Sequence, residues 1–265
     1  MSRVYLQKKS FVTRVFNKLY AMVIQPLHEK EFTASNGQTL RYMFFKEKES
    51  DVLLIGFQAC NDAGPRYNYV KTIRNCHVNN LFIKDDFGPG HFGDYYLGCN
   101  GTYSVEKAVF EMIDAYRKTC SPRKIIFIGS SKGAYAALNF GLQYPDSAVI
   151  AAAPQYFLGS YLAGGKWKPT LEEILGEPVS EGNKKQMDQR LSRIISKDPY
   201  TSTQKVYLHY SNMEHTYKEH IQYLLADLEK QGIPVEQDVE TYTVHAELKY
   251  YFPQYLENTV GRIVK

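Results

Sequence analysis

Five short, mainly apolar runs recur along this chain, with helical periodicity between most of them. The runs lie at residues 51–57, 80–84, 124–128, 147–153 and 205–210. Apolar runs of this length, without strict alternation, are typical of strands that are covered on both faces. Their alternation with helical stretches predicts a mostly parallel central sheet with helices packed against it.

The first predicted strands form a pair instead. Residues 30–35 and 38–46 flank Asn36-Gly37, the dipeptide best suited to a two-residue hairpin turn because both of its positions tolerate positive φ. An antiparallel hairpin is therefore expected at the N-terminal edge of the sheet.

Three helices can be placed from capping and periodicity signals. One is expected to begin with Ser104 as its N-cap and to end before Pro122. A second is predicted by the apolar face that runs from Tyr217 to Leu228. After a strand at 235–244, a last helix is expected at 252–263.

Two segments depart from this rhythm. Residues 155–203 contain several Gly and Pro and the single Trp167, which favours an insertion with short helices of its own over a core unit. Residues 1–25 combine basic side chains with apolar positions at helical spacing. They predict a basic amphipathic helix, which either lies on an anionic membrane surface or a partner, or packs against its own domain.

Composition narrows the class of protein. With 265 residues, 44% of them hydrophobic and 23% charged, the chain can bury a sizeable core, and a single domain over 1–265 is expected. The formal net charge of +4 is too small, and Lys and Arg are too scattered, to indicate a nucleic-acid partner. The four cysteines include no C-x-x-C pair, and no stretch resembles a signal peptide or a membrane span, so a cytoplasmic location is expected.

The strongest chemical signal lies between Lys124 and Leu138, which reads as a strand, a G-x-S-x-G turn and a helix. Gly129 and Gly133 let the chain turn sharply, so that the central Ser131 projects above the sheet edge in a strained conformation. Ser131 is therefore predicted to be a nucleophile. The alternative is a tight Gly-Ser turn without chemistry.

A nucleophilic serine needs a base and an acid, which in this architecture follow the late strands of the sheet. Glu214 is the first carboxylate after the last apolar run, and His245 follows the last predicted strand. Ser131, Glu214 and His245 are thus the predicted triad. The other histidines of this region are weaker candidates for the base, because they fit surface, capping or in-strand positions: His209, His215 and His220.

Acyl transfer also needs hydrogen-bond donors for the negative oxygen that develops in the transition state. The backbone N–H of Lys132, and that of Phe57 or Gln58 in the loop after the first buried strand, occupy the usual places for these donors. The Lys132 side chain is expected to face solvent or an anionic substrate.

Residues 84–98 form a loop after a strand that should end at the same sheet edge as the nucleophile. Asp85, Asp86, His91 and Asp94 suggest a metal site, but their spacing matches no metal motif. The glycines and the proline of this stretch favour a structural Ω-like loop that shapes the substrate site.

In combination, the Asp-Asp-Phe-Gly and Tyr-Tyr-Leu-Gly sequences within 85–98, the Gly-Ser-Ser-Lys-Gly elbow and the segments around Glu214 and His245 resemble a bacterial group of α/β-hydrolase-like proteins. That group occurs with capsular polysaccharide biosynthesis and includes the glycan O-acetyltransferase component of the accessory Sec system. The resemblance runs from about residue 51 to the C-terminus. It implies an α/β-hydrolase fold and a Ser-Glu-His triad, which falls on Ser131, Glu214 and His245.

The expected function is that of a serine-dependent acyl-ester enzyme, an O-acetyltransferase or O-acetyl esterase acting on a bacterial surface glycan or capsular polysaccharide, with no metal or organic cofactor. The insertion at 155–203 is expected to cap the nucleophile, with Trp167 and Tyr156 as sugar contacts. Glycan-biosynthesis proteins are candidate partners, and residues 1–25 are a candidate peripheral contact with the inner face of the membrane if they do not pack against their own domain. The alternative is a non-catalytic binding or scaffold protein of a glycan biosynthesis or export complex.

Overall fold

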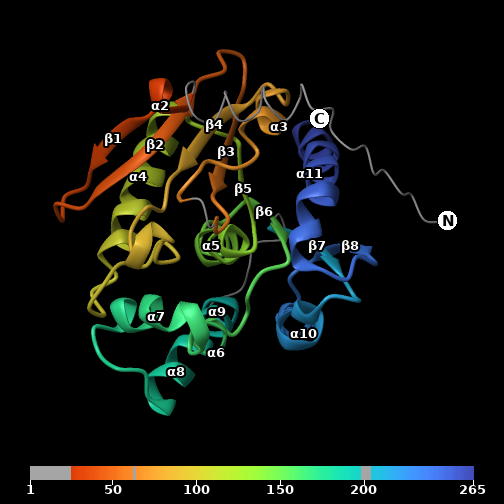
Figure 1. The fold of residues 1–265 in the computed structure, drawn as a ribbon. Helices are drawn as coiled ribbons and strands as arrows, with labels where there is room; N and C mark the ends of the chain where they lie inside the picture. The colour runs from red at the N-terminus through yellow and green to blue at the C-terminus, as the bar shows by residue number, and fades with distance from the viewer. Residues whose placement is uncertain (1–24, 62–63, 198–203) are drawn as a thin grey trace, which may run out of the picture.

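An eight-stranded sheet lies at the centre of the computed structural model, which describes residues 25–61, 64–197 and 204–265 (Figure 1). The sheet order is β1-β2-β4-β3-β5-β6-β7-β8. Strand β2 is antiparallel to both of its neighbours, and all other pairs are parallel. The strands are β1 Lys30–Thr33, β2 Thr39–Phe45, β3 Val52–Phe57, β4 Asn79–Ile83, β5 Lys124–Ser130, β6 Ser147–Ala152, β7 Lys205–Ser211 and β8 Val235–Glu240.

Helices cover both faces of this sheet, because the central strands alternate apolar side chains toward each face. On one face, α4 Ser104–Cys120, α5 Lys132–Gly141 and α10 Gln222–Lys230 pack with strand residues such as Leu53 and Phe127. On the other face, α3 Val70–Arg74 and α11 Leu248–Val264 pack with residues such as Leu54 and Ile126. The predicted α/β-hydrolase fold with a mostly parallel sheet and an N-terminal hairpin is confirmed.

The segment between β6 and β7 holds a group of short helices, as expected. They are α6 Leu158–Leu162, η3 Gly165–Trp167, α7 Lys168–Leu175, α8 Glu181–Asp188 and α9 Arg190–Ile195. Helices α6 to α9 gather below the sheet in the view of Figure 1. The remaining short elements are α2 Gln25–His28, η2 Pro89–His91, the π-helical turn η4 Tyr217–Ile221 and η5 His245–Glu247.

The hairpin turn differs from the expected two-residue type. The N–H of Ala34 donates to Gln38 O and the N–H of Gly37 donates to Ala34 O, each at 2.9 Å, so the five residues 34–38 between the strands form a three-residue loop, 35–37, closed by the Ala34–Gln38 contact. Within this turn Gly37 has positive φ and Asn36 does not. The Asn36 side chain instead bonds the Gln38 N–H and Ser104 O, which ties the turn to the start of α4.

Several element boundaries also differ from the sequence prediction, including those of α4, β8 and α11. Ser104 is the first residue of α4 and not its cap, because the preceding Tyr103 takes a left-handed conformation without a side-chain cap. Strand β8 ends at Glu240, opposite the end of β7 at Ser211, where the paired chain turns away. Helix α11 begins earlier than expected, at Leu248.

The predicted amphipathic segment at 1–25 lies, except for its last residue, outside the described residues. In the part of the chain that the structure describes, no helix is both long and apolar enough to cross a membrane.

Candidate active site

The chain turns sharply between β5 and α5, and Ser131 is the residue at the turn. Its backbone has φ 52° and ψ −119°, a strained conformation for a residue other than glycine. A Cβ on Gly129 would lie 2.1 Å from Gly133 O, and one on Gly133 would lie 2.6 Å from Phe57 O. Both flanking positions therefore require glycine, and the local geometry is that of a nucleophile elbow.

The two serines of the elbow have different surroundings. The Ser130 side chain is buried, and its hydroxyl shares a 2.6 Å hydrogen bond with Tyr69 Oη. The Ser131 side chain is half-buried, and its Oγ accepts a 3.0 Å hydrogen bond from Gln155 Nε2. Of the two hydroxyls, that of Ser131 is therefore the less buried one.

Glu214 and His245, predicted from the order of the late strands, lie together. Glu214 follows β7 and is buried, whereas His245 lies in η5 with 31% of its side chain exposed. The His245 Nδ1–H donates to Glu214 Oε1 at 3.0 Å, and the Thr216 hydroxyl donates to Glu214 Oε2. Burial alone would raise the pKa of the Glu214 carboxyl, but the hydrogen bonds from His245 and Thr216 outweigh it and the net pKa lies below its usual value.

Within the described residues no hydrogen bond joins Ser131 Oγ to the His245 ring, although the Oγ only accepts from Gln155 and its own proton is free to be donated. Contacts between catalytic groups often shorten only when a substrate binds, so this geometry does not remove His245 as the base. The triad stays a prediction, with its acid and base already paired.

The other histidines occupy three different environments. His215 is 55% exposed at its side chain, yet its Nε2 lies 3.2 Å from Glu214 Oε1 and its Nδ1 lies 3.0 Å from Glu219 Oε2. His220 is buried, and burial lowers its pKa to about 4. His209 is buried in β7, where its Nδ1 contacts Asp238 Oδ2 at 2.6 Å. His215 is thus the one competitor of His245 for the acid.

The structure separates the candidate oxyanion donors. The Gln58 N–H donates to Tyr96 Oη at 2.7 Å, and that hydroxyl donates in turn to Ile83 O, so the Gln58 donor is already used inside the protein. The N–H of Lys132 lies at the first position of α5, where helix geometry provides no intrahelical acceptor. Phe57 ends β3, and its carbonyl faces Gly133.

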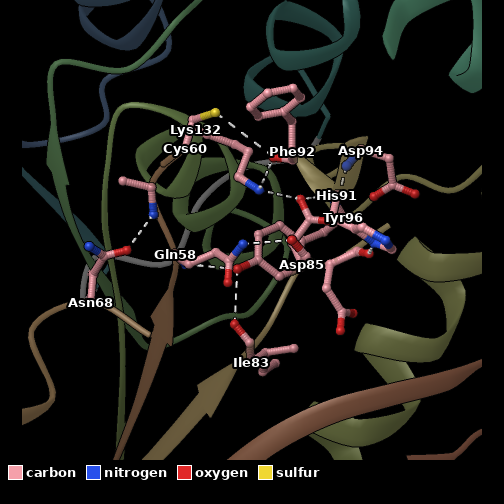
Figure 2. A network of polar contacts seen from close by, with 12 residues as sticks. Gln58, Cys60, Asn68, Ile83, Asp85, His91, Phe92, Asp94, Tyr96 and Lys132 are labelled. Atoms are coloured by element: carbon pink, nitrogen blue, oxygen red, sulfur yellow. Dashed lines mark hydrogen bonds and ion pairs between the residues drawn. The ribbon is translucent and has the colours of Figure 1, made fainter. Parts of the chain in front are cut away.

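The Lys132 side chain points inward, which corrects the expectation that it faces solvent or substrate. Figure 2 shows its ammonium between Asp85 and Phe92, with 2.8 Å to Asp85 Oδ2 and 3.0 Å to Phe92 O. The side chains of Lys132 and Asp85 are 2% and 0% exposed. Asp85 also accepts the backbone N–H groups of Asp94 and Tyr96, so one buried carboxylate joins the 84–98 loop to the elbow.

The other polar groups of this loop serve structural contacts. Asp86 pairs with Arg41 at 2.7 Å, and His91 Nδ1 contacts the Asp86 carbonyl at 3.0 Å. Burial, together with the neighbouring Asp85, raises the pKa of Asp94 well above its usual range, which favours the protonated acid. These contacts favour the interpretation of 84–98 as a structural loop over its interpretation as a metal site.

One residue at the site was missed by the sequence analysis. Gln155 lies three residues beyond the end of β6, is buried, and donates to Ser131 Oγ. Its Oε1 is buried and has no hydrogen-bond partner among the described residues. The available signal was its position, since the carboxyl ends of the adjacent strands β5 and β6 meet at one sheet edge.

The two predicted sugar contacts differ in accessibility. Tyr156 is buried and its hydroxyl bonds Asp227, so it has no surface left for a substrate and this assignment is corrected. Trp167 is half-buried, with its ring 5.8 Å from that of Phe92 and 6.4 Å from that of Tyr161.

Comparison with other proteins gives no match to a family model and none to a curated protein sequence. Solved structures do match. A capsule O-acetyltransferase of Neisseria meningitidis serogroup A is 20% identical, with a TM-score of 0.70 over 87% of this chain and 93% of that one. A glycosylation associate protein complex from Streptococcus agalactiae is 14% identical, with a TM-score of 0.73 over 89% of this chain but only 46% of the other.

A third similar structure is the fluorophosphonate-binding serine hydrolase F of Staphylococcus aureus, at 10% identity and a TM-score of 0.65 over 89% of this chain and 97% of that one. At identities of 10–20% these similarities show a shared fold. At the level of the fold, they confirm the resemblance to capsule-associated α/β-hydrolase-like proteins that the sequence indicated.

Proposed function

We propose that this protein is a serine acyl-ester enzyme that places acetyl groups on, or removes them from, a bacterial surface glycan. The observation that carries the proposal is the elbow conformation of Ser131, at the sheet edge where the His245–Glu214 pair also forms. Strain of this kind persists only where the surrounding structure imposes it, and it is concentrated at functional sites.

The proposed chemistry has two steps. Ser131 Oγ attacks the acyl carbonyl while His245 takes the hydroxyl proton, and the bond to the leaving alcohol or thiol breaks as His245 returns that proton to it. In the second step an acceptor hydroxyl or water attacks the acyl-serine while His245 takes its proton, and the bond to Ser131 Oγ breaks as His245 returns that proton to Oγ. Glu214 orients the ring and stabilises the imidazolium, and its low pKa keeps it ionised for this role at neutral pH.

Gln155 is proposed as the second oxyanion donor. Besides the Gln58 N–H, the Ala59 N–H is also occupied, by Asn68 Oδ1 at 2.8 Å. The amide of Gln155, 3.0 Å from Ser131 Oγ, is within reach of an oxygen on the carbon that Oγ attacks. The Nε2 atom of Gln155, and not its Oε1, must face Ser131 Oγ. An amide oxygen there would accept the hydroxyl proton that Ser131 has to donate to the base.

The proposed substrates follow the proteins of similar fold. One similar structure is a capsule O-acetyltransferase, and a variant of that enzyme has been solved in complex with CoA. This supports an acyl thioester of CoA as donor and a capsular or protein-linked saccharide as acceptor. The complex from Streptococcus agalactiae supports glycan-biosynthesis proteins as partners.

A fluorophosphonate probe tests the nucleophile. Labelling of Ser131 in the folded protein, with Ser130 spared, is expected because the Ser130 hydroxyl is buried against Tyr69. Peptide mass spectrometry locates the adduct, with Ser131→Ala as control. Adducts at Ser130, or none on folded protein, would remove the catalytic reading and favour a non-catalytic scaffold.

Gln155→Leu is expected to lower kcat for hydrolysis of a small acetyl ester by about 10²-fold, the usual effect of losing one oxyanion donor. Leucine has a similar volume, so the fold should be retained and melting curves check this. Gln155→Glu, which replaces the donor with an acceptor, should lose at least as much. Unchanged kcat in both variants would place the second donor elsewhere.

A further inference from the structure

A cavity of about 380 Å³ opens between the helical insertion and η4. Its walls include three aromatic side chains, Phe157, Tyr161 and Tyr223, together with Lys218, Glu219 and His220. The volume lies within the range of sites that bind small molecules. Neither the predicted triad nor the oxyanion donors use any of these side chains.

The rings form a connected wall. The ring of Phe157 lies 5.1 Å from Tyr223 and 6.2 Å from His220, and the ring of Tyr161 lies 5.8 Å from His220. Tyr161 also stacks with Trp167, which extends the wall toward the 84–98 loop. Tyr223, 47% exposed, is the most open member. The cavity therefore offers large apolar faces to anything that enters it.

His220 adds an unused hydrogen-bond donor. Its Nδ1 accepts the Phe157 N–H at 3.2 Å, so in the neutral ring the proton is on Nε2. Burial lowers the pKa of His220 to about 4, and the ring is neutral at physiological pH. The Nε2 atom is buried and has no hydrogen-bond partner in the described part of the chain. Such a group favours a ligand oxygen as its acceptor.

The cavity wall is connected to the predicted catalytic acid. Glu219 Oε2 lies 3.0 Å from His215 Nδ1, and His215 Nε2 lies 3.2 Å from Glu214 Oε1. Glu214 Oε1 in turn accepts the hydrogen bond from His245. One histidine, His215, thus links Glu219 in the cavity wall to Glu214.

We propose that this cavity binds one sugar ring of the acyl acceptor and so holds the acceptor chain beside the acyl-serine. The inference rests on the proposed function, since it names the acceptor subsite of that reaction. A sugar ring has an apolar C–H face, which the aromatic rings cover, and a rim of hydroxyl groups, which His220, Lys218 and Glu219 can bond. One cation and one anion at the rim favour an uncharged ring over a strongly anionic one.

The experiment measures binding without turnover. Ser131→Ala protein is applied to an array of bacterial capsular and surface oligosaccharides, alone and combined with Tyr223→Ala or Tyr223→Phe. Binding is expected to fall about 5- to 10-fold with alanine, which loses the ring, and to stay close to the parent with phenylalanine, which keeps it. The matched control is Tyr250→Ala on α11, where a tyrosine of similar exposure, 54%, lies outside the cavity wall.

Two results would overturn the proposal: binding of no saccharide on the array, or binding that Tyr223→Ala and Tyr250→Ala affect equally. Fluorophosphonate labelling of the protein with Ser131 intact is scored separately. Labelling without glycan binding removes the subsite and leaves an acyl-ester enzyme of another acceptor class. Glycan binding that depends on Tyr223, without labelling, retains the subsite and removes the chemistry.

Discussion

His245→Ala is expected to lower kcat for hydrolysis of a small acetyl ester by about 10⁴-fold or more, because removing one triad member leaves only the oxyanion donors and binding. His215 is the histidine to compare with His245, because both rings lie near Glu214 Oε1. The distance is 3.2 Å from His215 Nε2 and 3.0 Å from His245 Nδ1. His215→Ala should keep most of the activity, since His215 is engaged at its other nitrogen by Glu219.

Initial rates on the same ester, with matched circular dichroism spectra, decide between the two histidines. The reverse pattern, with His215→Ala inactive and His245→Ala active, would show that the base comes from the loop after β7. Comparable activity in both variants and in the parent would mean that neither histidine removes the serine proton.

Lys132→Met is expected to lower the free energy of unfolding by about 3–5 kcal/mol, the usual cost of leaving one partner of a buried ion pair alone. The side chains of Lys132 and Asp85 are almost completely buried, so no water replaces the lost ammonium. The double variant Lys132→Met with Asp85→Asn should recover part of this loss, because the remaining amide carries no charge. Urea denaturation measures all three proteins.

The matched control is the exposed pair of Arg123 and Asp51, which also meets at 2.8 Å but has side chains 63% and 58% exposed. Arg123→Met should change the free energy of unfolding by less than about 1 kcal/mol, because solvent screens that interaction. A loss of similar size in Lys132→Met and Arg123→Met would show that burial does not determine the strength of the Lys132–Asp85 pair.

The features that sequence alone predicted are those governed by local sterics or by strand order. The elbow depends on Gly129 and Gly133, where any Cβ collides with backbone. The sharp turn can therefore be predicted from the motif alone. Glu214 and His245 could be predicted to lie together because parallel strands deliver their carboxyl ends to one edge. Neither inference needed the position of a side chain.

The features that sequence did not predict depend on contacts between distant loops. Nothing in the residues around Lys132 indicates that its ammonium meets Asp85, 47 positions away, and not solvent. The role of Gln155 could not be predicted either. Only its contact with Ser131 in the folded chain sets its amide apart from other glutamine side chains. Tyr156 was misassigned because an aromatic residue in an insertion can equally pack inward, as it does here.

The Lys132–Asp85 pair limits how this sequence can drift during evolution. A Cβ on Gly93 would lie 2.0 Å from Lys132 Nζ and 2.4 Å from Asp85 Oδ2, so no side chain fits at residue 93 while the pair is present. A lineage that exchanged Lys132 first would pass through an ancestor with an isolated buried carboxylate. Positions 85 and 132 are therefore expected to change together in descendants of this chain, and a side chain at position 93 is expected only after both have been exchanged.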